Sequence, residues 1–181
     1  NTALALQVDA IAQGLANVSF LAFPLFIVAS NSNPYFSALE IVGLVIWVLA
    51  FAMESVADLQ KAGFLKAMKK AGKQRQVCNV GLWKYCRHPN YFAEWMVWNG
   101  LVIAAIPSWL SLRGLETDPV WYLLGVGLLM ASGFMYASLV YITGAVPSEY
   151  YSAQKRPGYT DYQKQTNRFF PGPRKDCSPH S

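Results

Sequence analysis

The stretch Gly81-Leu82-Trp83-Lys84-Tyr85-Cys86-Arg87-His88-Pro89-Asn90-Tyr91-Phe92-Ala93-Glu94 runs from a basic loop into a strongly apolar segment. Its polar residues continue into that segment instead of stopping at the edge. Asn90 and Glu94 are four residues apart, so on a helix they share one face. A carboxylate inside an apolar helix is energetically costly and usually marks a functional site. The stretch therefore predicts a membrane helix with a site at its start.

The composition indicates an integral membrane protein. Hydrophobic residues make up 54% of the 181 residues and charged residues only 14%, whereas a soluble domain has about 25% charged residues. Four apolar runs are long enough to cross a bilayer, at residues 11–29, 39–57, 91–110 and 120–146. We expect Pro107 to break the third run near its far end. The predicted fold is an all-α membrane bundle of about four transmembrane helices.

The basic residues indicate the orientation of this bundle. Of fifteen Lys and Arg residues, eight lie within residues 61–87 and six within residues 155–175. By the positive-inside rule, the N-terminus, the basic loop and the C-terminus are expected on the cytoplasmic side of a bacterial inner membrane or of the endoplasmic reticulum. No fold signature of nucleic-acid binding accompanies the charge, so no nucleic-acid partner is expected. We predict one domain (1–173) with a cofactor-binding loop (60–90), a C-terminal segment (147–173) and a flexible tail (174–181).

Acidic residues occur at the predicted cytoplasmic ends of two runs. Glu54 and Asp58 are four residues apart at the end of the second run, and Glu94 follows the start of the third. One interpretation is a site formed by these side chains at one membrane level. The alternative is that Glu54 and Asp58 only reach the interface and pair with Lys61 or Arg87. No cysteine or histidine spacing typical of a metal site is present, so no metal is expected.

The Arg87-His88-Pro89 sequence favours an anion. Pro89 can begin a helix, whose free N–H groups and positive dipole end attract negative charge. Arg87 adds a bidentate donor for phosphate. More positive charge comes from Lys66, Arg75 and Arg156. The alternative for Arg87 and His88 is contact with lipid headgroups.

Two further features are less specific. Trp98 lies four residues beyond Glu94 on the same helix face, where it would line an apolar ligand pocket or pack against other helices and lipid. Tyr159 and Tyr162 follow a basic turn and would close an anion site if the C-terminal segment folds back under the helices.

Three motifs together resemble the steroid 5-alpha-reductase-like membrane family, and most closely its short bacterial-type branch. They are Glu54-Ser55-Val56-Ala57-Asp58-Leu59-Gln60, the Gly81–Glu94 stretch, and Lys155-Arg156-Pro157-Gly158-Tyr159-Thr160-Asp161-Tyr162. They occur in the order of the family and cover roughly residues 39–171. The Arg-His-Pro part alone is also similar to isoprenylcysteine carboxyl methyltransferases.

The resemblance implies an NADPH site in a polar cavity on the cytoplasmic side. The matching positions are Glu54, Asp58, Arg87, His88, Asn90 and Tyr91, with Arg156, Tyr159 and Tyr162 closing over the nucleotide. Glu94 and Trp98 match positions that face the nicotinamide and the lipidic substrate. Ala93 stands where the family usually has Gly. Family members have further N-terminal spans, which carry the residues that polarise the substrate carbonyl, so the resemblance also suggests the cofactor half of a larger protein.

The expected function is NADPH-dependent reduction of a carbon–carbon double bond in a membrane-dissolved enone, such as a 3-oxo-4-ene steroid. The nicotinamide would deliver hydride to the β-carbon, with Glu94 as proton donor or as a group that organises the nicotinamide. The alternative is an S-adenosylmethionine-dependent membrane methyltransferase of the isoprenylcysteine carboxyl methyltransferase type. A third, non-enzymatic class is a lipid-binding or scaffold protein, against which an intramembrane Glu94 counts.

Overall fold

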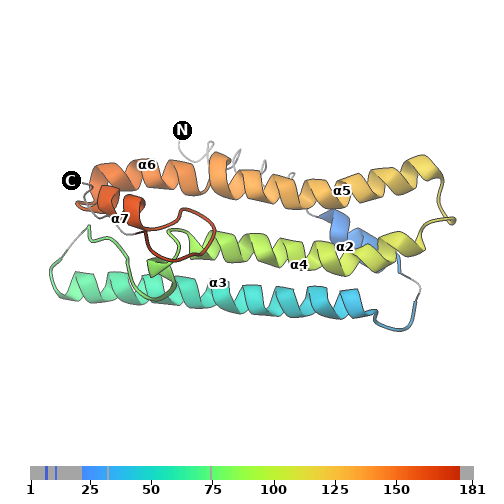
Figure 1. The fold of residues 1–181 in the computed structure, drawn as a ribbon, viewed down its shortest axis with the longest axis horizontal. Coiled ribbons are helices and arrows are strands. Elements are labelled where there is room, and N and C mark those ends of the chain that lie inside the picture. Colours follow the sequence, from blue (N-terminus) through green and yellow to red (C-terminus); the bar gives the residue numbers. More distant parts are fainter. Residues whose placement is uncertain (1–6, 8–10, 12–21, 32, 74, 176–181) are drawn as a thin grey trace. The chain divides into compact units, whose positions relative to one another are not determined.

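The computed structural model describes Gln7, Ile11 and residues 22–31, 33–73 and 75–175. The helices of the described part are α2 (Ala22–Ala29), α3 (Ala38–Lys70), α4 (Pro89–Ser111), α5 (Asp118–Ala137), α6 (Ala145–Lys155) and α7 (Tyr159–Gln165) (Figure 1). These residues contain isolated β-bridges but no strand. The predicted all-α class is therefore confirmed for the described residues. Most of the predicted first span, residues 11–29, lies outside them.

Two helical segments have the length and composition of membrane-spanning helices. They are α3, which contains an 18-residue stretch of mean hydropathy 2.0, and the 38-residue segment Asp118–Lys155, which contains one of 1.9. In the described part of the chain this is fewer than the four predicted spans. The predicted third span forms α4, but α4 does not reach the same hydropathy, because its Glu, Asn and Trp residues interrupt the apolar sequence.

Helix boundaries differ from the prediction in two places. α3 has 33 residues and continues to Lys70, so the first part of the predicted loop is helical. α4 begins at Pro89, as expected, but it continues through Pro107 to Ser111. The predicted break at Pro107 is wrong. A proline four residues before a helix ends removes one hydrogen bond, and a membrane-type helix tolerates that loss when its neighbours pack around it.

The segment after α5 changes its winding before α6. Residues Ser138–Ile142 form a π-helical turn (η3), and Thr143 N–H donates to the Ser138 carbonyl at 3.1 Å. At Gly144 an added Cβ would lie 1.9 Å from the Leu139 carbonyl oxygen, so only glycine fits. Such π turns are rare and frequently occur near functional sites. This turn connects the apolar helix α5 to the polar helix α6.

The chain divides into two compact units. The first comprises the described residues up to Trp47 together with Val97–Met135, and the second comprises Val48–Met96 together with the described residues from Tyr136 onward. In the first unit, α3 and α4 approach each other closely at Gly43 and Gly100. A Cβ at Gly100 would lie 2.8 Å from both the Gly43 carbonyl oxygen and the Trp47 backbone nitrogen. Small residues of this kind allow close packing of membrane-type helices.

Aromatic and apolar side chains complete the first unit. Trp109 and Trp121 stack at 4.3 Å, and each indole N–H donates to the other residue's backbone carbonyl, at 2.9 and 3.0 Å. Ile27, Ala105 and Leu128 form a buried cluster. The second unit is different in kind, because its buried centre is polar and contains the candidate site.

Candidate functional site

The segment before α4 is fixed against α3. It forms a short 3₁₀ turn (η2, Gly81–Lys84), in which the Trp83 indole donates to the Ala57 carbonyl at 2.9 Å. The Gln60 side chain accepts from the Leu82 N–H at 2.8 Å. Gly81 has a φ of +52°, and an added Cβ would meet the Gln60 side chain at 2.3 Å. These contacts set the direction in which the chain enters α4.

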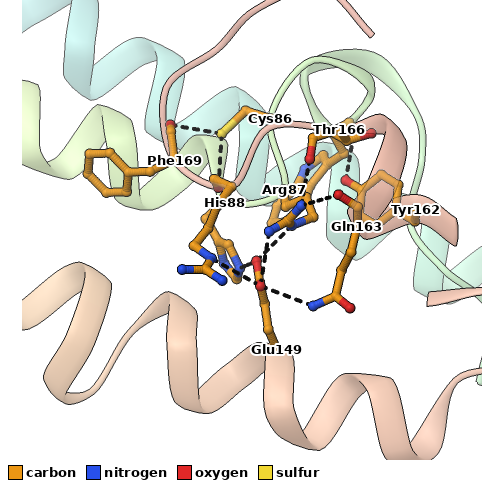
Figure 2. Close-up of polar contacts among 10 residues, drawn as sticks. Cys86, Arg87, His88, Glu149, Tyr162, Gln163, Thr166 and Phe169 are labelled. Atoms are coloured by element: carbon orange, nitrogen blue, oxygen red, sulfur yellow. Dashed lines mark hydrogen bonds and ion pairs between the residues drawn. The ribbon is translucent and has the colours of Figure 1, made fainter. Parts of the chain in front are cut away.

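A buried ion pair lies at the start of α4 (Figure 2). Arg87 Nε donates to Glu149 Oε1 at 2.7 Å, and Arg87 Nη2 donates to Glu149 Oε2 at 3.0 Å. The side chains are only 7% and 4% exposed. Arg87 Nη1 donates to the backbone carbonyls of Gln163 and Thr166, both at 2.6 Å. The guanidinium thus joins α4, α6 and the segment around the end of α7.

Glu149 accepts from three further side chains. His88 Nε2 lies 3.1 Å from Glu149 Oε1, while Gln163 Nε2 and Arg168 Nε lie 3.1 and 3.2 Å from Oε2. Burial, the largest cause, lowers the pKa of His88 below its usual value and outweighs the opposing effect of Glu149. His88 is therefore neutral near pH 7 and donates its Nε2–H to the carboxylate. A carboxylate with this many donors is held in its ionised form.

Residues 159–172, which we call the strap, lie along the segment that precedes α4. Gly158, with a φ of +77°, begins the turn into α7. Arg87 N–H donates to the Asn167 carbonyl at 2.8 Å, and Gly172 N–H donates to the Tyr85 carbonyl at 3.1 Å. The Cys86 thiol donates to the Phe169 carbonyl at 3.0 Å, and burial raises its pKa to about 11. Cys86 is therefore a packed, unreactive thiol.

Side chains of the strap are also buried. The Tyr162 hydroxyl donates to the Trp83 carbonyl, and burial raises its pKa well above the usual range. Burial likewise raises the pKa of Tyr159 to about 12. Phe169 packs edge-on against Phe92, Trp95 and Tyr136, with ring centroids 5.2–6.0 Å apart. The strap is therefore part of the core of the second unit.

A basic groove of about 340 Å³ opens beside this core. The apolar part of its lining is Phe64, Leu65 and Met68 of α3. The polar part is Lys69, Lys73, Arg75, Gln76, Lys155 and Arg156. Arg156 also lines a small cavity with Lys61, Arg87, His88, Tyr159 and Tyr162, among others. The groove therefore combines apolar side chains with five cationic side chains in its lining.

The acidic side chains of α3 and α4 form a separate part of the second unit. Glu54, Asp58 and Glu94 are close enough to interact electrostatically. In the described residues, no ion pair within 4 Å joins any of the three to a basic side chain. Glu54 and Asp58 therefore form no close pair with Lys61 or Arg87, although Asp58 and Lys61 are near enough to interact electrostatically. Lys61 lies instead over the Trp83 ring, 4.5 Å from its centroid.

Asn90 and Tyr91 lie in sequence between Arg87 of the ion pair and Glu94 of this acidic group. The Asn90 Oδ1 atom is buried, and no donor of the described chain reaches it. Tyr91 stacks on His88 with ring centroids 5.2 Å apart and an angle of 6° between the planes, and it interacts electrostatically with Glu94 and Asp58. A buried acceptor without a donor costs free energy unless a ligand supplies the donor.

Comparison with known proteins gives one finding. A family model matches residues 3–166, which is most of the chain. The chain belongs to the DUF1295 family. The family is described as proteins of unknown function. No curated protein and no solved structure matches the chain.

In this DUF1295 chain, the predicted site residues separate into groups. Arg87, His88, Arg156, Tyr159 and Tyr162 line one small cavity, as a group drawn from the second and third motifs. Glu54, Asp58, Tyr91 and Glu94 interact with one another. Arg75 lines the basic groove, whereas Lys66 is exposed and lies outside the groove lining. Trp98 is half-buried, one helical turn beyond Glu94 in α4.

Several residues of the site were missed by sequence reasoning. Glu149 is the clearest, since it accepts hydrogen bonds from four side chains. One signal was available: Glu149 is the only acidic residue between Asp118 and Asp161, and it follows an apolar run by three residues. Gln163 and Arg168 carry no comparable signal. The groove residues Lys69, Lys73 and Lys155 look like any other lysine of a basic interfacial stretch.

Proposed function

We propose that this protein is an NADPH-dependent reductase of a carbon–carbon double bond in a lipidic enone, such as a 3-oxo-4-ene steroid. The observation that supports it most directly is the basic groove, whose lining includes Lys69, Lys73, Arg75, Lys155 and Arg156. NADPH carries a pyrophosphate and a further phosphate on the adenosine ribose. Lysine and arginine are the usual partners of such groups.

The residues present fit the ends of this cofactor. Phe64 and Met68 of the groove floor suit an adenine ring, and the surrounding cations suit its phosphates. Arg156 lines both the groove and the cavity beside His88, and because that cavity holds only about 20 Å³, Arg156 would contact the ligand from the groove side. The unpaired Asn90 Oδ1 suits a donor on the ligand, such as an amide or a hydroxyl.

The acidic residues would form the end of the site at which the reaction takes place. NADPH, when bound, supplies the hydride for the double bond. Glu94 and Tyr91 would orient the reacting ring, because they adjoin Asn90 in the first turns of α4. Glu54 and Asp58 would keep this end polar, because both interact electrostatically with Glu94. The two helices of membrane-spanning composition support a substrate dissolved in lipid.

The alternative cofactor, S-adenosylmethionine, has no phosphates. It would leave the five cations of the groove without an anionic ligand, which makes the methyltransferase the weaker candidate. Adding NADPH, NADH or S-adenosylmethionine to the detergent-solubilised protein, with thermal unfolding as the measurement, separates the candidates. We expect stabilisation by NADPH, about 2.7 kcal/mol at a hundredfold excess over Kd. Stabilisation by S-adenosylmethionine alone would contradict the reductase proposal.

Charge substitutions in the groove test the site itself. Lys73→Ala and Arg75→Ala should each weaken NADPH binding by about tenfold, since each removes a charged partner of a phosphate. Lys70→Ala is the matched control, because Lys70 carries the same charge in the same stretch but is exposed and outside the groove lining. Equal losses in Lys70→Ala and the groove variants would mean that only general charge attraction is measured.

A further inference from the structure

Arg87 has almost no capacity left for a ligand. An arginine side chain has five N–H donors, and here four hydrogen bonds go to Glu149 and to the carbonyls of Gln163 and Thr166. Its charge is also neutralised by a carboxylate that is itself buried. Figure 2 shows the guanidinium between Glu149 and Gln163, directed at protein atoms. This arrangement does not suit a residue that binds a phosphate directly.

Glu149 is the shared acceptor for donors from two other parts of the chain. Arg87 and His88 immediately precede α4, Glu149 itself belongs to α6, and Gln163 and Arg168 belong to the strap. Among the described residues, no other carboxylate lies within hydrogen-bond distance of these donors. Without it, Arg87 keeps only its two backbone carbonyl acceptors, and His88, Gln163 and Arg168 lose this acceptor.

We propose that Arg87 and Glu149 form a latch: a positioning pair that holds the strap against the start of α4 and touches no ligand. The latch keeps Tyr159 and Tyr162 in the wall of the cavity that Arg156 shares with the basic groove. It therefore affects ligand binding through the closed position of the strap, while direct contacts come from the groove cations.

The chain contains a matched control for this pair. Asp161 and Lys164 form an ion pair at 3.3 Å within the strap, but their side chains are 71% and 64% exposed. An exposed pair contributes little, because water replaces the lost partner. Loss of one partner of a buried pair leaves an uncompensated buried charge. Glu149→Gln and Asp161→Asn remove the same charge in these two settings.

Trypsin cleavage after Arg168 measures how often the strap opens. In Glu149→Gln and Arg87→Met we expect this cleavage to be at least tenfold faster than in the unsubstituted protein, and in Asp161→Asn to change by less than twofold. Cleavage after Lys73 and Arg75, in the α3–α4 loop, should stay the same in all variants. Faster cleavage at every site would show global loosening and would overturn the latch, as would no change after Arg168.

A double variant tests whether the two residues act as one unit. If they do, Arg87→Met/Glu149→Gln opens the strap no faster than the more affected single variant, because the pair is already broken. Multiplied effects of the two substitutions would mean that each residue holds the strap independently, and the latch would be wrong.

Ligand affinity distinguishes a latch from a direct contact, and this part rests on the proposed NADPH site. Both single variants should lose NADPH affinity by the same factor, since each lowers the fraction of protein with a closed strap. A loss at least tenfold larger in Arg87→Met than in Glu149→Gln would make Arg87 a ligand residue and overturn the proposal. If the unsubstituted protein does not bind NADPH, the proposed function fails, while the cleavage test of the latch still stands.

Discussion

The two compact units of this chain pack by different means. In the first unit, α3 and α4 touch through glycine and backbone atoms at Gly43 and Gly100. In the second unit, residues 62 positions apart in the sequence meet as the buried pair Arg87 and Glu149. Close backbone packing depends on volume and is insensitive to charge. A buried ion pair depends on its partner being present.

The stability of the two units should therefore respond to different kinds of substitution. A methyl group should matter in the first unit and a single charge in the second. The following predictions test that contrast in order of expected size.

Loss of Arg87 should have the largest effect on stability. Arg87→Met keeps an unbranched apolar stem but leaves the Glu149 carboxylate buried without its main partner, which costs about 3–5 kcal/mol. The measurement is the free energy of unfolding in detergent. Lys164→Met is the control, because it breaks only the exposed pair with Asp161 and should change stability by less than about 1 kcal/mol. Similar losses in the two variants would remove the distinction between buried and exposed charge.

A methyl group at Gly43 should have the second largest effect. Its Cβ would lie 2.5 Å from the Ala104 backbone nitrogen and 2.6 Å from the Gly100 carbonyl oxygen. Backbone atoms cannot rotate away, so Gly43→Ala should destabilise the protein by about 1–3 kcal/mol. Gly133→Ala is the control in the same unit, since a Cβ there meets nothing within 4 Å.

The Gly133→Ala control should raise stability by up to about 1 kcal/mol, because alanine favours the helix. The check is thermal unfolding of both variants side by side. If Gly43→Ala is as stable as Gly133→Ala, the close approach of α3 and α4 is not required for folding.

The smallest effect concerns pH and His88. Burial lowers the pKa of folded His88, with Arg87 and Lys61 acting in the same direction and Glu149 against it. The unfolded side chain has a pKa of about 6.5. The folded state therefore binds this proton less readily, and the stability contributed by neutral His88 is complete above about pH 6.5 and is lost as the pH falls below it.

His88→Gln tests this dependence, because glutamine donates to Glu149 but does not titrate. Between pH 7.5 and pH 5.5 we expect the melting temperature of the unsubstituted protein to fall by a few degrees more than that of His88→Gln. Parallel curves for the two proteins would show that His88 does not contribute to the pH dependence.

Local sequence features predicted much of the fold. The apolar runs predicted helices at α3 and α4 and in the segment that begins with α5, and Pro89 correctly marked the first residue of α4. The prediction of a helix break at Pro107 failed, because the local sequence does not show whether the residues packed around a proline tolerate it within a helix. Among the described residues, α4 does not reach the hydropathy of a spanning helix, because its Glu, Asn and Trp residues interrupt the apolar sequence, while most of the first predicted span lies outside them.

The opening stretch shows what the sequence by itself determined. A polar face that enters an apolar helix is a local pattern, and it located Asn90, Tyr91 and Glu94 at the start of α4. The sequence also determined that the positive charge is concentrated in two stretches, and residues from both stretches line the groove. These properties follow from helical periodicity and composition, which are read directly from neighbouring residues.

The tertiary structure alone decided the partner of each charge. Arg87 looked equally suited to a phosphate and to a carboxylate, because a guanidinium binds both in the same geometry. Only the folding of α6 and the strap against α4 brings Glu149 and two backbone carbonyls to its donors. Pairing between residues more than sixty positions apart depends on how helices meet, and no local pattern in the sequence encodes it.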